Sequence, residues 1–83
     1  AGMTTLTREV LTLVAAMAPD GTARPHLDSA LVADLGYSSL RLLELSIAVE
    51  RAFALAPLSQ DKLAGITTVG DLVELVRDQR DPS

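Results

Sequence analysis

The side chains best suited to chemistry in this chain are two adjacent serines, Ser38 and Ser39, which directly precede an apolar helical pattern. With Ser38 as the N-cap, Ser39 is the first helical residue. The unpaired amide hydrogens of a first helical turn and the helix dipole favour a negative group, so a phosphate ester on Ser39 would be stabilised there. Such a modification requires an exposed hydroxyl that makes no capping bond. The pattern by itself also fits two serines that only cap the helix, because serine is a preferred N-cap residue.

Other reactive arrangements fit the sequence less well. The stretch from Gly36 to Leu40 lacks the second glycine of a nucleophile elbow, and the sequence offers no convincing base for a serine nucleophile. Glu44 and Glu50 would lie on different faces of a helix, which does not suit an acid–base pair. His26, the single histidine, is expected to be a solvated loop residue. We therefore expect no catalytic residue and no metal site, and a protein that is not an enzyme.

The helix expected from about Ser39 to Phe53 has apolar side chains on two opposite faces. Its first stripe consists of Leu42, Leu45, Ser46, Val49 and Phe53. Its second stripe, here called the docking stripe, consists of Leu40, Leu43 and Ile47. One stripe serves the core of a small domain, whereas the second has no internal partner in so short a chain. We expect the docking stripe to bind partner proteins, oriented by nearby charges on Glu44, Glu50 and Arg51.

The composition predicts one small helical domain. Of the 83 residues 48% are apolar, mostly Leu, Val and Ala, with one Phe, one Tyr and no Trp. Leu and Ala are helix formers, and the aromatic residues that enrich strands are nearly missing. We expect a single domain over residues 3–83 with its core at about 6–77. Ala1 and Gly2 are expected to be a cloning remnant before a native Met3.

Charge and hydropathy argue against several classes of partner. A net charge of −4, with seven scattered Lys and Arg, does not suit nucleic-acid binding, which needs a clustered basic face. No apolar run approaches the roughly 20 residues of a membrane span, and no signal peptide is visible. We expect a cytoplasmic monomer that binds no membrane. Because cysteine is absent, any thiol chemistry would come from a prosthetic group.

Apolar periodicity and helix-breaking residues predict an all-α four-helix bundle with a long first loop and a short third helix. The first helix is expected from Thr7 to about Ala18, and a loop from Asp20 to about Tyr37 follows. A short helix capped by Ser59 is expected after Pro57. Four loop residues are expected to attach the loop to the core: Leu27, Leu31, Val32 and Leu35.

The last helix is expected to begin after Thr68, where Thr68 and Asp71 resemble a capping box. Its buried stripe is expected to consist of Val69, Leu72, Val73 and Val76. The polar tail from Asp78 to Ser83 is expected to be frayed.

Two segments in this order resemble a known family. Asp34-Leu35-Gly36-Tyr37-Ser38-Ser39-Leu40, followed by Glu44-Leu45, is similar to the acyl carrier protein signature, and Ile66–Val73 resembles the family's opening to its last helix. The two matches span roughly Leu6 to Val76. The resemblance implies that Ser39 carries a covalent phosphopantetheine arm. It also implies a phosphopantetheinyl transferase, a loading enzyme, and synthase or tailoring enzymes as partners.

The chain departs from the family pattern in its charges. Ser38 stands where the family usually has Asp, and the charges between Ser39 and Phe53 sum to zero. Carriers of fatty-acid synthesis resemble a markedly acidic version of this helix. The neutral helix favours dedicated natural-product machinery, either polyketide or a hybrid with amino-acid building blocks, and Gly36-Tyr37 is similar to carriers of aromatic polyketide pathways. The leading hypothesis is a freestanding carrier that holds an acyl or aminoacyl group as a thioester on Ser39. The alternative is an unmodified helical interaction module that retains the carrier fold.

Overall fold

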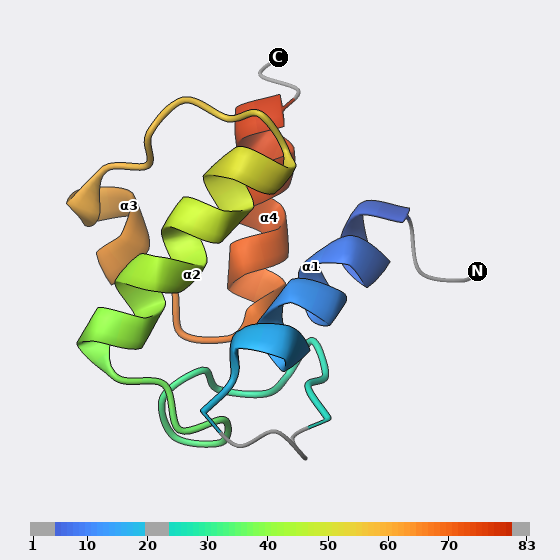
Figure 1. The fold of residues 1–83 in the computed structure, drawn as a ribbon, viewed down its shortest axis with the longest axis vertical. Helices are drawn as coiled ribbons and strands as arrows, with labels where there is room; N and C mark the ends of the chain where they lie inside the picture. Colours follow the sequence, from blue (N-terminus) through green and yellow to red (C-terminus); the bar gives the residue numbers. More distant parts are fainter. Residues whose placement is uncertain (1–4, 20–23, 81–83) are drawn as a thin grey trace.

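The computed structural model describes residues 5–19 and 24–80, and over these residues the chain forms four helices. They are α1 (Thr5–Met17), α2 (Ser39–Ala52), α3 (Gln60–Ala64) and α4 (Val69–Arg80). Helix α1 packs against both α2 and α4, and α3 lies on the other side of these two helices (Figure 1). Within the described residues no strand forms, and the single backbone bridge joins Ala30 to Thr68. The predicted all-α bundle with a short third helix is confirmed.

The core lies between α1, α2 and α4, and it consists mainly of valine and leucine. The buried apolar residues of these helices are Val10, Val14, Leu45, Val49, Val69, Leu72, Val73 and Val76. All four residues of the predicted α4 stripe are buried. On α2 the predicted stripe is correct in direction, but Leu42 and Phe53 are only half-buried against this core. Phe53 lies at the end of α2, and the guanidinium carbon of Arg80 lies over its ring, 5.6 Å from the ring centroid.

The long connection before α2 is attached to the core by fewer leucines than expected. Leu31 and Leu35 are buried, whereas Leu27 and Val32 are 39% and 59% exposed. A turn explains the exposure of Val32, because the amides of Asp34 and Leu35 both donate to the carbonyl of Ala30. This turn directs Leu31 and Leu35 inward and leaves Val32 outside. The prediction that all four side chains anchor the loop was therefore wrong for two of them.

Tyr37 supplies an anchor that the sequence patterns did not reveal. Its side chain is 2% exposed, and its hydroxyl donates to the Val14 carbonyl of α1 at 2.7 Å. Burial raises the pKa of the Tyr37 hydroxyl to about 12, and the nearby Arg41 opposes this shift. Gly36, with φ +76°, makes the backbone turn that precedes it. The residues just before α2 are thus fixed to α1 across 23 positions of sequence.

Backbone hydrogen bonds also attach this connection to the start of α4. The Leu31 amide donates to the Thr67 carbonyl at 2.9 Å, and the Val69 amide donates to the Ser29 carbonyl at 3.0 Å. The capping box predicted at Thr68 is present, with the Thr68 hydroxyl accepting from the Asp71 amide at 3.2 Å. In return the Asp71 carboxylate accepts from the amides of Thr67 and Thr68, and these bonds lower its pKa.

The ends of α2 and α4 differ from the predicted ones. Helix α2 ends at Ala52, with Phe53 as its C-cap and Ala54 at φ 55°, and the Leu55 amide donates to the Glu50 carbonyl at 2.8 Å. This is a Schellman-type end, made with alanine where glycine is usual. Helix α4 continues to Arg80, so the prediction of a frayed tail from Asp78 was wrong for residues 78–80. Basic side chains in the last turn favour this extension, and residues 81–83 lie outside the described part.

Candidate functional site

Ser38 caps α2, as the sequence predicted. Its backbone is extended, at φ −95° and ψ 171°, and its side-chain oxygen accepts from the Arg41 amide at 3.2 Å. Its carbonyl accepts from the Leu42 amide at 2.9 Å, which is the first bond of the helix. Ser39 is therefore the first residue with helical geometry.

Ser39 meets the requirements for a modified side chain. It is exposed, and its hydroxyl makes no hydrogen bond to any residue in the described ranges. The amides of Ser39 and Leu40 also lack an acceptor within residues 5–19 and 24–80. An anion attached to the Ser39 oxygen would lie beside these amides and at the positive end of the dipole of a 14-residue helix. The geometry fits a phosphodiester at this position.

The charges beside Ser39 largely cancel one another. The Arg41 guanidinium lies 3.7 Å from the Glu44 carboxylate, one helical turn along α2, and both side chains are partly exposed. An exposed pair of this kind contributes little to stability and is screened by salt. The start of α2 therefore carries one positive and one negative side chain paired with each other, and no net acidic charge.

The docking stripe is exposed, as predicted. Leu40, Leu43 and Ile47 are 67%, 50% and 43% exposed, and they follow one side of α2. Of the three charges expected to orient partners, Glu44 and Arg51 are exposed.

Glu50, the third of these charges, has a contact inside the fold. Its carboxylate accepts from the Leu58 amide at 2.9 Å, which holds the connection between α2 and α3. No sequence pattern indicated this bond, because Leu58 lies eight residues away in an irregular segment. A role of Glu50 in docking remains a prediction.

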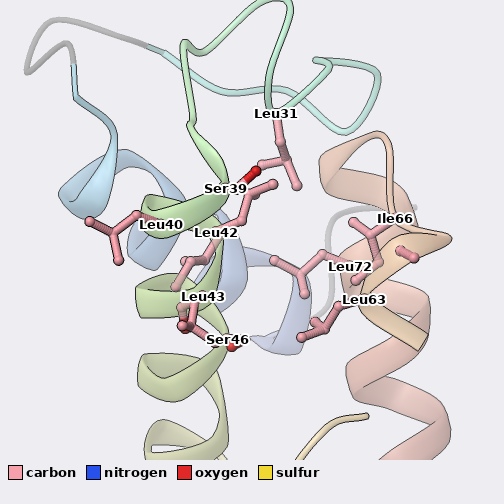
Figure 2. A pocket seen from close by; sticks show the side chains of 11 residues that line it. Leu31, Ser39, Leu40, Leu42, Leu43, Ser46, Leu63, Ile66 and Leu72 are labelled. Atoms are coloured by element: carbon pink, nitrogen blue, oxygen red, sulfur yellow. Dashed lines mark hydrogen bonds between the residues drawn. The ribbon is translucent and has the colours of Figure 1, made fainter. Parts of the chain in front are cut away.

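A cavity of about 510 Å³ lies beside Ser39 and was not foreseen from the sequence. Its walls come from α2, from α3 and its connection to α4, and from Leu31 and Leu72 (Figure 2). Nine of its eleven lining residues are apolar, and the other two are Ser39 and Ser46. The lining residues are Leu31, Ser39, Leu40, Leu42, Leu43, Leu45, Ser46, Leu63, Ala64, Ile66 and Leu72. The sequence feature that could have predicted this cavity is Ser46, a small residue in a stripe of α2 whose other side chains are large and apolar.

A second hollow of about 340 Å³ lies between α1 and the far end of α2, away from Ser39. No group of three or more His, Asp or Glu side chains able to hold a metal occurs among the described residues. The side chain of His26 is exposed in the first loop. Among the helices of the described ranges, none is long and apolar enough to cross a membrane.

Comparison with known proteins agrees with this geometry. The model of the family described as "phosphopantetheine attachment site" matches residues 8–76, which includes α2 and most of α4. No curated protein matches the chain. Members of this family are carrier domains that hold phosphopantetheine covalently on a serine, and they are not enzymes. With a family match over most of its length, the chain belongs to the phosphopantetheine-binding acyl carrier proteins.

Proposed function

We propose that Ser39 is the attachment serine and that the protein is a freestanding carrier of acyl thioesters in polyketide or hybrid natural-product biosynthesis. One observation carries the proposal: the Ser39 hydroxyl is exposed, makes no hydrogen bond within the described residues, and stands at a helix N-terminus and at the edge of an apolar cavity. A transferase can reach this hydroxyl from solvent. The prosthetic group supplies the thiol that the cysteine-free chain lacks.

The neighbouring serine is the less suitable attachment site. The Ser38 oxygen accepts the Arg41 amide at 3.2 Å and so holds the first turn of α2. A phosphodiester on that oxygen would compete with this capping bond. Ser39 loses no bond on modification, because its hydroxyl has no partner among the described residues.

The cavity favours acyl over aminoacyl cargo. A charged ammonium group gains nothing from a lining of leucine, isoleucine and alanine, whereas an acyl chain would be removed from water there. Transfer of one methylene group into such a space is worth about 0.8 kcal/mol. Because the cavity begins at Ser39, a flexible arm could fold back and place its cargo inside.

The surface of α2 supports the partner class that we propose. The docking stripe is exposed, and the charges of α2, from Arg41, Glu44, Glu50 and Arg51, sum to zero. Partners that bind this surface would rely on apolar contact more than on basic patches. We propose a transferase, a loading enzyme, and synthase or tailoring enzymes of a dedicated biosynthetic pathway as these partners. We further propose a monomer that acts in the cytoplasm.

The test is intact-mass spectrometry after incubation with coenzyme A and a promiscuous phosphopantetheinyl transferase. The protein should gain the mass of one phosphopantetheine group, and Ser39→Ala should abolish the gain. Ser38→Ala is the matched control, one residue away, and should keep most of it. A wild-type protein that stays unmodified would instead favour the alternative, an interaction module that retains the carrier fold without its arm.

A further inference from the structure

Ser46 is a buried polar group in the wall of the cavity. Its side chain is 3% exposed and lines the same space as Ser39, seven residues earlier on α2. Seven residues are about two helical turns, or about 10 Å of rise. Figure 2 shows Ser39 close to Leu31 at one end of the space and Ser46 farther along α2, facing the leucines on the opposite wall. The two serines therefore lie about two helical turns apart along one wall of the same cavity.

The hydroxyl of Ser46 is bonded on one side only. It donates to the Leu43 carbonyl at 2.6 Å, in the manner common for serine inside a helix. A serine oxygen also has two lone pairs that can accept hydrogen bonds. Within the described part of the chain, no donor reaches this oxygen. The Ser46 oxygen is therefore available as an acceptor at a place that the rest of the lining makes apolar.

Alanine would suit this position better if only the helix and the core mattered. It has a higher helix propensity than serine and buries no polar atom. A larger aliphatic residue would fill the space and extend the buried stripe of Leu42, Leu45 and Val49. Serine does neither: it keeps the cavity open and places one acceptor inside it.

We infer that Ser46 is a specificity-determining residue that selects acyl cargo bearing a hydroxyl group. The inference rests on the proposed function and deepens it. The cargo hydroxyl donates to the Ser46 oxygen while the rest of the chain contacts leucine and isoleucine. An unsubstituted chain of equal length fits the same space but leaves the acceptor unpaired, which costs affinity. The hydroxylated chain then stays longer in the cavity, where solvent and the reagents that cleave its thioester reach it less.

The experiment compares matched cargoes on the whole 83-residue chain. Octanoyl, 3-hydroxyoctanoyl and 5-hydroxyoctanoyl phosphopantetheine are loaded from the corresponding coenzyme A thioesters, and the loading itself is checked by mass. The rate of thioester cleavage by hydroxylamine then reports how much of the cargo is exposed. Wild type is compared with Ser46→Ala, which removes the acceptor at nearly constant volume, and with Ser46→Thr, which retains it.

For at least one hydroxyoctanoyl cargo we expect Ser46→Ala to accelerate cleavage about fivefold, as the loss of one hydrogen bond would. The octanoyl cargo should change less than about 1.5-fold, because it never used the acceptor. Ser46→Thr should restore slow cleavage of the hydroxylated chain. Equal acceleration of cleavage for all three cargoes would overturn the inference, since Ser46 would then stabilise the phosphopantetheine arm or the helix and would not distinguish the cargoes. No acceleration of any cargo would also overturn it. Failure of the loading step would instead count against the proposed function.

Discussion

Tyr37→Phe tests whether one hydroxyl fixes the first loop to the bundle. The substitution keeps the ring and removes the bond that the hydroxyl donates to the Val14 carbonyl at 2.7 Å. That carbonyl lies in the last turn of α1, where intrahelical donors run out, so the loss leaves a buried acceptor poorly satisfied. A net hydrogen bond contributes about 0.5–1.5 kcal/mol, and an unsatisfied buried group costs about 1–3 kcal/mol. We expect a loss of about 1.5 kcal/mol of unfolding free energy.

The same substitution should change the alkaline limit of stability. The Tyr37 pKa is about 12 in the folded protein against 10.0 for an ordinary tyrosine, so the folded state holds this proton more tightly. The resulting stabilisation is fully present below pH 10 and is lost as the pH rises from 10 to 12, by about 1.4 kcal/mol per pH unit at most. Tyr37→Phe has no proton to lose, so its unfolding free energy should fall less steeply over this range.

Urea denaturation and thermal melting, both followed by circular dichroism, measure the two effects. At neutral pH the midpoint should fall without a change in slope, and the melting temperature should drop by about 6–12 °C. Thr12→Val is the control, because it removes an exposed hydroxyl bond to the Arg8 carbonyl, at 2.8 Å, and should stay within about 0.5 kcal/mol. A Tyr37→Phe protein as stable as this control would refute the role assigned to the hydroxyl. A dependence of unfolding free energy on alkaline pH that is the same for Tyr37→Phe and wild type would also refute it.

Three further substitutions test local features of the fold and the site. Ala54→Gly should raise the unfolding free energy by about 0.5–1 kcal/mol, because Ala54 has φ 55° and glycine adopts this geometry without strain; a loss of stability in urea denaturation would contradict this. The Asp71 carboxylate should stabilise the wild-type fold above about pH 4, and this stabilisation should be lost as the pH falls through the lowered pKa of Asp71 in the folded state. Asp71→Asn should lack this pH-dependent stabilisation. Melting temperatures of wild type and Asp71→Asn that change in the same way with acid pH would disprove it. Ser38→Asp should leave the stability of the fold unchanged or raise it by about 0.3–1 kcal/mol. It should also raise the rate of modification by a transferase adapted to acidic carriers, and a gain in rate that persists at high salt would rule out an electrostatic cause.

The sequence determined the features that depend on neighbours within one or two helical turns. Ser38 as cap, Ser39 as first helical residue, and the exposed docking stripe all follow from the 3.6-residue period and from capping chemistry, and each agrees with the structure. The buried stripe of α4 and its capping box were predictable for the same reason. Family resemblance added the phosphopantetheine arm, which no periodicity implies.

Only the tertiary structure decided what lies between segments distant in the sequence. The bond from Tyr37 to Val14 spans 23 positions, and the bond from Leu31 to Thr67 joins the first loop to the segment just before α4. Neither leaves a local pattern, because a tyrosine before a helix and a leucine in a loop are compatible with many environments. The cavity has the same origin, since its walls meet only when α2 and α3 are placed together. Ser46 was visible in the sequence as a serine within an apolar stripe, but only the packing of the helices places its oxygen beside an apolar cavity.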